Sequence, residues 1–188
     1  MGGNKILRIE TERLIIRKFV TDDWKYLQEI AISKEQSEFA DCDHPWPTDD
    51  RGIKEVVEYF SNEHQFWAVE VKELEKVVCF ININYMDDEQ TLDIGHVMNS
   101  KYLGNDFEYE ALKALYNYGF IQLGAERIQA KWACNNKNKL APLLKLGMNI
   151  TEKRMTDKFR PDPDGNESQF EACTLIISKE EWLKNPAK

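Results

Sequence analysis

Residues 94–111 read IGHVMNSKYLGNDFEYEA and join an expected β-strand to an expected helix. The strand, Thr91 to Met98, is apolar and is bounded by polar turn residues. The helix, from about 107 to 123, carries its apolar side chains on one side, and Gly124 provides a stop signal. Ligands of such units bind at the carboxyl end of the strand and the amino end of the helix. This stretch therefore predicts a binding site as well as a local fold.

The segments on either side of this unit predict how its strand is paired. Residues 127–133 form the next expected strand, and the helical crossover predicts that it runs parallel to residues 91–98. Short polar turns separate 66–72, 77–85 and 91–98, which predicts an antiparallel meander. The remaining expected elements are strands at 12–19, 151–159 and 169–178, helices at 22–32 and around 53–60, a short helix that contains Pro142 and ends at Gly147, and a terminal turn at 179–184. This order predicts an α+β fold with a mixed, mostly antiparallel central sheet of about seven strands and flanking helices.

Length and composition favour a single globular domain, residues 1–188. Hydrophobic residues make up 42% and charged residues 31% of the chain, which excludes a disordered or fibrous protein. The formal net charge of −8 argues against nucleic acid and anionic membranes as partners, and its sign suits a cationic small substrate. No stretch approaches the roughly 18 apolar residues of a membrane span, and the start lacks the apolar run of an export signal. We therefore expect a cytoplasmic protein.

The cysteines predict neither a disulfide framework nor a metal site. Cys42, Cys79, Cys134 and Cys173 lie far apart in the sequence, which indicates reduced thiols. Cys42 and His44 are close together, but a metal site needs further ligands, and the other two histidines have no zinc-like spacing. We therefore expect no metal.

Short motifs in the loop after residue 98 and near residue 140 are similar to those of one enzyme family. Lys101, Gly104 and Asp106 fall on the first, fourth and sixth positions of a loop of the form Arg/Gln-x-x-Gly-x-Gly/Ala. Asn136 with Lys145-Leu146-Gly147-Met148 looks like an Asn…Lys-Leu-Gly-Phe signature. On these motifs the chain resembles the GNAT N-acetyltransferase superfamily, and more narrowly its RimJ/RimL-like branch.

The resemblance covers nearly the whole chain, from Thr11 to near Ile177, and it implies a fold and a reaction. The fold is the acyl-CoA N-acyltransferase fold, and the reaction is direct transfer of an acetyl group from acetyl-CoA, a co-substrate, to a primary amine. The acceptor would be a small molecule or a protein N-terminus, and the protein a monomer or homodimer. The implied coenzyme-binding residues are Val97 and Met98, whose backbone amides are candidates for holding the thioester carbonyl, and Lys101, Leu103, Gly104, Asn105, Asp106, Phe107, Asn136 and Lys139.

Several positions depart from the family pattern. Asp106 stands where a glycine or alanine lets the backbone approach the pyrophosphate, and Glu108 follows closely. Like charges about 5 Å apart at an effective dielectric of about 20 repel by roughly 3 kcal/mol, which would weaken coenzyme binding. Lys139 replaces a serine that in the family lies beside the pantetheine arm. Two alternatives stay open: either Asp106 turns outward or caps its own helix in an active acetyltransferase, or the chain is a degenerate GNAT-fold binding or regulatory module that has lost acetyl-CoA binding.

Acid and base groups must come from the strands of the cleft, because Leu144 stands where many members of the family carry a tyrosine acid. Asp93 and His96 are the ionisable residues nearest to the implied thioester. Strict alternation would put them on opposite faces of their strand, but the family's strand has a bulge here, and a bulge at Gly95 would turn both toward the cleft. His96 would then be a candidate base, since histidine titrates near neutral pH.

Two further residues are candidates for binding the acceptor. Glu70 lies on an expected strand, and its carboxylate suits a cationic amine. Trp46 lies in the segment DHPWP, residues 43–47, before a helix that in this family closes over the acceptor side. Each has an ordinary structural alternative: a solvated strand glutamate, and a tryptophan that holds its loop to the core.

Overall fold

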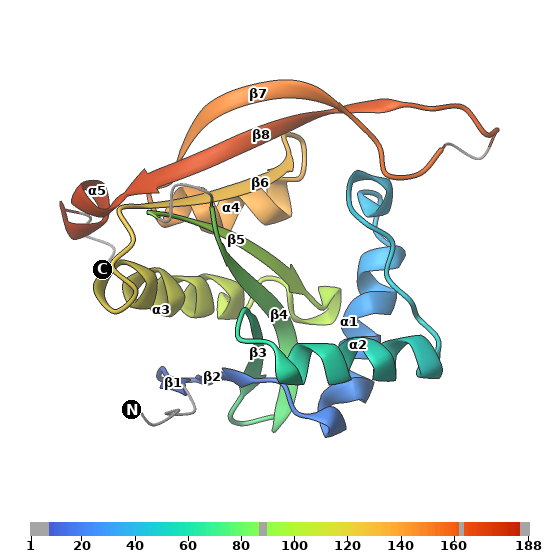
Figure 1. The fold of residues 1–188 in the computed structure, drawn as a ribbon, viewed down its shortest axis with the longest axis horizontal. Helices are drawn as coiled ribbons and strands as arrows, with labels where there is room; N and C mark the ends of the chain where they lie inside the picture. The colour runs from blue at the N-terminus through green and yellow to red at the C-terminus, as the bar shows by residue number, and fades with distance from the viewer. Residues whose placement is uncertain (1–7, 87–89, 162–163, 185–188) are drawn as a thin grey trace.

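The computed structural model describes residues 8–86, 90–161 and 164–184 and contains an eight-stranded sheet (Figure 1). Its strands are β1 (Ile9–Glu10), β2 (Leu14–Lys18), β3 (Phe66–Val71), β4 (Lys76–Tyr85), β5 (Thr91–Met98), β6 (Arg127–Ala133), β7 (Asn149–Asp157) and β8 (Gln169–Ser178). The strand order is β1-β2-β3-β4-β5-β6-β8-β7. β5 and β6 are parallel, and the other neighbouring pairs are antiparallel. The predicted α+β class and the predicted parallel pair are confirmed.

The strand that the sequence did not predict is β1. It consists of Ile9 and Glu10, and it pairs with β2 through Ile9 opposite Ile16. Two residues are too short to show the apolar and polar alternation by which a strand is recognised. The expected count of about seven strands is therefore one too low.

The helices are α1 (Trp24–Glu35), α2 (Asp50–Asn62), α3 (Phe107–Ile121), α4 (Lys137–Lys145) and α5 (Lys179–Lys184). Short 3-10 turns occupy residues 21–23, 40–42 and 100–102. Pro142 lies within α4 and does not split it, although the helix continues for only three residues beyond it. A proline beyond the first turn lacks the N–H that would bond the carbonyl four residues earlier, and the few residues that follow Pro142 limit how far this disturbs the helix.

Two apolar cores lie on the two faces of the sheet. On one face, α1 and α2 pack onto β4 and β5; the buried residues there include Leu27, Ile30, Ile53, Val57, Phe80 and Val97. On the other face, α3 and α4 pack onto β5 and β6; these include Ile94, Leu112, Leu115, Ile128, Leu140 and Leu143. Burial of each such side chain contributes roughly 1.5–3 kcal/mol, so the helices hold the central strands firmly from both sides.

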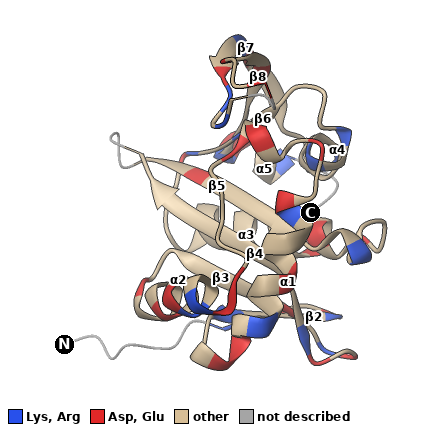
Figure 2. Ribbon diagram, turned by 90° about the vertical axis from the view of Figure 1, so that its right-hand side faces the viewer, with Lys and Arg blue, Asp and Glu red and all other residues tan. Residues whose placement is uncertain are grey.

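The centre of the sheet carries few charges. Lys76 is the charged residue of β4, and Asp93 is the carboxylate of β5, whereas the helices carry many charged residues (Figure 2). Strands covered on both faces are expected to be apolar, so a polar side chain on them needs a reason. No helix in the described ranges is long and apolar enough to cross a membrane.

Candidate active site

The sheet opens between β5 and β6. The two strands pair in parallel over three residues, ending with Asp93 opposite Gln129, and no further pair joins them within the described ranges. β5 remains paired to β4 as far as Met98. The carboxyl-terminal half of β5 therefore has an unpaired edge that faces β6 across a gap, and its backbone groups are available to a ligand.

Backbone N–H groups of this edge are directed into the gap. Asn99 N–H donates to the carbonyl oxygen of Val78 in β4 at 2.9 Å. The hydrogen-bonding side alternates along a strand, so the N–H of Val97 also points to β4, whereas the N–H of Met98 points to the gap. The expectation that Val97 could hold a ligand carbonyl is therefore wrong, because β4 occupies that side of its backbone.

The start of α3 offers backbone N–H groups to an anion. The first intrahelical bond runs from Glu110 N–H to the carbonyl oxygen of Asp106 at 3.0 Å, so residues 107–109 have no acceptor within the helix. Asp106 has a φ of 59°, and its side chain does not cap the helix. Its carboxylate instead lies 3.1 Å from Nζ of Lys145. Asp106 thus turns outward, which is the first of the two alternatives raised by the sequence.

The loop before α3 presents backbone rather than side chains. Gly104 has a φ of 83°, and a side chain added there would meet no atom within 4 Å. Leu103 and Asn105 are exposed, and Phe107 is half-buried. Lys101 lies with its Nζ 4.0 Å from a carboxylate oxygen of Glu29, and its side chain is 72% exposed. The open loop and the uncapped helix together form a concave anion site.

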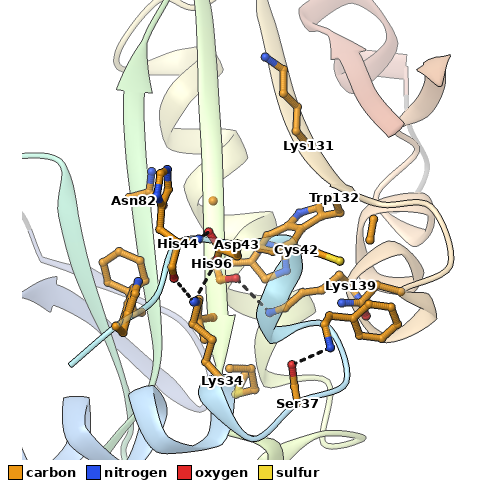
Figure 3. A pocket seen from close by; sticks show the side chains of 18 of the residues that line it. Lys34, Ser37, Cys42, Asp43, His44, Asn82, His96, Lys131, Trp132 and Lys139 are labelled. Carbon is orange, nitrogen blue, oxygen red and sulfur yellow. Dashed lines mark hydrogen bonds and ion pairs between the residues drawn. The ribbon is translucent and has the colours of Figure 1, made fainter. Parts of the chain in front are cut away.

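Glu108 and Lys139 form a buried ion pair beside the gap. Oε1 of Glu108 lies 3.0 Å from Nζ of Lys139, and Glu108 is 7% exposed. Lys139 also donates to the carbonyl oxygen of His96 at 3.0 Å (Figure 3). Burial acts to raise the pKa of Glu108, but the Lys139 ammonium and His96 together outweigh it, and the pKa falls to about 2. The Glu108 carboxylate is therefore ionised, and its negative charge is balanced by the Lys139 ammonium.

His96 is completely buried and lacks a well-formed side-chain hydrogen bond. Nε2 lies 3.0 Å from Oε1 of Glu108, but the angle is poor, and neither ring nitrogen has a hydrogen-bond partner among the described residues. The ring packs edge-on against Trp132, with 5.0 Å between ring centroids. Burial lowers the pKa of His96, and the nearby Lys139 ammonium lowers it further. A neutral imidazole with free nitrogens therefore lines the gap.

Asp93 and His96 lie on opposite faces of β5. The pairing of β4 with β5 shows no register shift from Tyr85 opposite Leu92 to Cys79 opposite Met98, so the expected bulge is absent. Asp93 accepts a hydrogen bond from Gln129 at 3.0 Å on the face covered by α1 and α2. His96 contacts α3 on the other face. The expected bulge is wrong, because an unbroken ladder keeps strict alternation, but both residues line the cavity, each from its own face of the sheet.

A cavity of about 930 Å³ passes through the gap and is lined from both faces of the sheet. On the face of α3 and α4 it is lined by His96, Glu108, Asn136 and Lys139. Asn136 also caps α4, because its Oδ1 accepts a hydrogen bond from the Lys139 N–H at 3.2 Å. On the face of α1 and α2 the lining is largely aromatic; it includes Trp46, Tyr59, Phe60, Phe66 and Phe80. A ligand bound from one face can thus meet a ligand bound from the other.

The hairpin of β7 and β8 extends toward the segment that follows α1 (Figure 1), and its residues Arg154, Thr156 and Phe170 line the cavity. The N–H of Phe159 donates to the carbonyl oxygen of Asp41 at 2.8 Å. The Phe159 ring lies 4.2 Å from that of His44, between centroids. Arg160 is within 2.7 Å of a Glu35 carboxylate oxygen. These contacts join two segments that are about 120 residues apart in the sequence, and no local sequence pattern predicts them.

The two expected acceptor-binding residues have different positions. Trp46 lines the cavity, with its ring 5.1 Å from that of Phe80 and nearly perpendicular to it. Glu70 is not in the cavity lining, and its carboxylate lies 2.8 Å from Nε of Arg17. Arg17 also binds Asp23 at 2.7 Å. The expectation for Glu70 is therefore wrong, because a neighbouring strand provides its cationic partner.

Comparison with known proteins gives a consistent picture. The family model described as "Acetyltransferase (GNAT) domain" matches residues 13–149. "Uncharacterized N-acetyltransferase YnaD" of Bacillus subtilis (strain 168) is 26% identical over 184 residues, which cover 94% of this chain and 99% of the relative. "Uncharacterized N-acetyltransferase p20" of Bacillus licheniformis is 29% identical over 128 residues, 64% of this chain and 70% of the relative.

Solved structures agree on the fold. The crystal structure of a GNAT-family acetyltransferase from Bacillus anthracis is similar with a TM-score of 0.78 and 25% identity, covering 93% of this chain and 100% of that one. The structure named as RimL, a ribosomal L7/L12 alpha-N-protein acetyltransferase, has a TM-score of 0.73 at 12% identity over 95% of this chain and 97% of that one. At 12% identity the second match shows the fold alone.

Proposed function

We propose that this chain, which belongs to the GNAT acetyltransferase family, transfers an acetyl group from acetyl-CoA directly to a primary amine. The observation that carries the proposal is the position of the uncapped start of α3 beside the unpaired edge of β5. Because the two features are adjacent, one ligand could place its pyrophosphate at the start of α3 and its pantetheine arm along the edge of β5. The structural similarity to ribosomal-protein acetyltransferases supports the RimJ/RimL-like branch only through the fold.

Donor binding would involve mainly backbone groups. The N–H groups at the start of α3 and the open loop at Gly104 would hold the pyrophosphate, and Lys101 would add a positive charge at the rim. The N–H of Met98 would donate to the thioester carbonyl oxygen and stabilise the oxyanion that forms during attack. Lys139 and Asn136 would lie beside the acetyl end of the arm.

His96 is the proposed proton carrier. The amine nitrogen attacks the thioester carbon, and a free nitrogen of the neutral imidazole accepts the proton that the amine loses. The carbon–sulfur bond then breaks, and the imidazolium returns this proton to the departing thiolate. Glu108, 3.0 Å from Nε2, would stabilise the imidazolium in between. Asp93, on the other face, would hold the acceptor's ammonium form before that form loses its first proton to solvent.

The competing function, a binding module without coenzyme, rested on the charges of Asp106, Glu108 and Lys139. Asp106 is paired with Lys145 and points away from the loop. Glu108 and Lys139 compensate each other inside the protein. With both carboxylates neutralised locally, the repulsion that motivated this alternative is greatly reduced, which favours the enzyme.

Calorimetric titration with acetyl-CoA at moderate salt tests the proposal. We expect micromolar binding of acetyl-CoA and of desulfo-coenzyme A, which lacks the thiol and therefore excludes disulfide formation with the free cysteines. Acetylated product formed from simple primary amines would then establish transfer. An absence of binding at millimolar acetyl-CoA would overturn the proposal and favour the binding module.

A further inference from the structure

We propose that the acceptor of this reaction is a small amine that also carries a carboxylate and an apolar group, and that Lys131 binds the carboxylate. The inference rests on the proposed acetyltransferase function and names its acceptor class. It differs from the expectation of a cationic substrate, which followed from the net charge of −8. Net charge describes the whole surface, whereas acceptor choice depends on the charges that line the cavity.

Lys131 lies across the gap from the expected reaction centre. The last pair of β5 with β6 is Asp93 opposite Gln129. Gly95 and Lys131 lie two residues further along these strands, on either side of the gap. Residues two apart on a strand point to the same face of the sheet, so Gly95 and Lys131 share the face of Asp93 and Gln129. Figure 3 shows Lys131 on β6 at one side of β5 and Asn82 on β4 at the other.

Lys131 is a cavity-lining cation without a counter-ion. Its side chain makes no ion pair or hydrogen bond with any residue that the structure describes, and the same holds for Arg154 on β7. The other cavity lysines are paired: Lys34 lies 3.5 Å from an Asp43 carboxylate oxygen, and Lys139 binds Glu108. Asp93 is the cavity carboxylate that pairs with a neutral group, the Gln129 amide, rather than with a cation. Lys131 and Arg154 outnumber it, so the net uncompensated charge of the cavity is positive, which favours an anionic group on the ligand.

Arg154 lies on the same face as Lys131. Ala172 of β8 pairs with both Arg154 in β7 and Ala133 in β6, and Ala133 is two residues from Lys131. Both side chains line the outer part of the cavity, where the hairpin covers it. Glu152, the nearest carboxylate on β7, contacts the Thr174 hydroxyl at 3.5 Å and is not in the cavity lining.

Polar and apolar groups complete the acceptor side. The Asn82 amide lies directly over Gly95, where an added Cβ would collide with it, and it has no partner among the described residues. An amide in this position can accept a hydrogen bond from the acceptor's amine. Beyond it, Trp46 and Phe80 form an aromatic wall that would bury an apolar group.

The closed hairpin favours a small acceptor. Phe159 and Arg160 hold the hairpin to the segment that contains Asp41, and Phe159 and His44 from these two segments both line the cavity. The hairpin therefore narrows the space beside the gap that an acceptor can occupy. A molecule with an amine, a carboxylate and one apolar side chain matches the groups that line this space.

Acetyl transfer to matched acceptors tests the inference. The probes are L-phenylalanine, L-phenylalaninamide and 2-phenylethylamine, with the leucine series in parallel, and acetylated product is measured by chromatography. We expect kcat/KM to be at least about tenfold higher for the amino acids than for the analogues that lack a carboxylate, as for a charge-assisted hydrogen bond. Lys131→Met should remove this preference. Lys153→Met is the matched control, because Lys153 is 54% exposed, pairs with Glu171 and should leave the preference intact.

A binding measurement separates failure of the inference from failure of the proposed function. N-acetyl-L-phenylalanine and its amide are titrated into the wild type and Lys131→Met, with no turnover required. Carboxylate-dependent binding that Lys131→Met abolishes would support the acceptor class even if no acetyl transfer were detected. Equal binding of the acid and the amide, or faster transfer to amines that lack a carboxylate, would overturn the proposed acceptor class. Transfer only to a protein N-terminal peptide would also overturn it, while leaving the acetyltransferase function in place.

Discussion

Nζ of Lys139 lies 3.0 Å from Oε1 of Glu108, and this ion pair is buried between α3, α4 and the free edge of β5. Taken alone, Glu108 brings a carboxylate close to the pyrophosphate loop, and Lys139 stands where the family carries a serine. Together they are neutral, and both contact His96: Glu108 lies near its ring, and Lys139 donates to its backbone carbonyl oxygen. The pair therefore belongs to the interior of the site rather than obstructing its entrance.

We predict that breaking this pair is costly and that removing both charges is much less so. Lys139→Met leaves the Glu108 carboxylate buried without a cation and should lower the free energy of unfolding by about 3–5 kcal/mol. Glu108→Gln should have a similar effect, and the double variant should recover most of the loss. Urea unfolding of the four proteins gives the double-mutant cycle. Additive losses would show that the two side chains do not interact.

Acid should destabilise the protein through His96 before carboxylates titrate. The pKa of His96 in the fold is below its usual value of 6.5 because burial disfavours the charged form. The unfolded chain thus binds more protons as the pH falls below 6.5, and stability should decrease from pH 7 to pH 5 by at most about 1.4 kcal/mol per pH unit. Stability should fall further below pH 4.5. The pKa of Glu108 is about 2 in the fold, so the unfolded chain takes up this proton more readily than the folded protein does.

The comparison protein for this pH series is His96→Gln, measured by urea unfolding at pH 7, 6 and 5. Glutamine has no proton to gain in this range, so the slope between pH 7 and pH 5 should be smaller than in the wild type. An unchanged slope would assign the acid sensitivity to other groups. The loss below pH 4.5 should persist in both proteins.

Asp106→Gly should change acetyl-CoA affinity by less than about tenfold, because the carboxylate already turns to Lys145 and is 65% exposed. Stability should change little. Glycine accepts the positive φ of 59° more readily, which offsets the loss of an exposed ion pair worth at most about 1 kcal/mol. Calorimetry measures the affinity. A gain of a hundredfold or more would mean that Asp106 does obstruct the coenzyme.

Gly104→Ala should weaken acetyl-CoA binding by about tenfold or more, because a Cβ would stand where the pyrophosphate approaches the backbone. Gly165→Ala is the matched control. Both glycines have a positive φ, 83° and 84°, and in both cases an added Cβ meets no atom within 4 Å. Each substitution should therefore cost a similar 1–2 kcal/mol or so of stability through the backbone alone. Equal affinities in the two variants would remove Gly104 from the coenzyme site.

Arg160→Met should loosen the hairpin over the cavity. The guanidinium lies 2.7 Å from Glu35 and also donates to the Ala40 carbonyl oxygen at 3.0 Å. Loss of these bonds should favour local opening by about 1.4 kcal/mol or more, so the Phe159 amide should exchange its hydrogen about tenfold faster. Exchange measured by NMR or mass spectrometry checks this, with amides of β4 as the internal reference. Unchanged protection would show that the remaining contacts, those of Phe159 with Asp41 and His44 among them, hold the hairpin without Arg160.

The sequence determined the elements and their pairing, because those depend on local patterns. Alternating apolar strands with short polar turns predicted the meander, and the helix between residues 98 and 127 predicted the parallel pair of β5 and β6. The loop around Gly104 predicted an anion site at the start of α3. These features need only a few neighbouring residues to be recognised.

Only the tertiary structure decided which side chains share the site. Glu108 and Lys139 are 31 residues apart and on different helices, and Lys131 reaches the gap only because β6 diverges from β5 after Gln129. The same packing directs Asp106 to Lys145, binds Glu70 to Arg17 and keeps Asp93 and His96 on opposite faces. Charge pairing depends on distances of a few ångströms between distant segments, and no local periodicity of the chain encodes such distances.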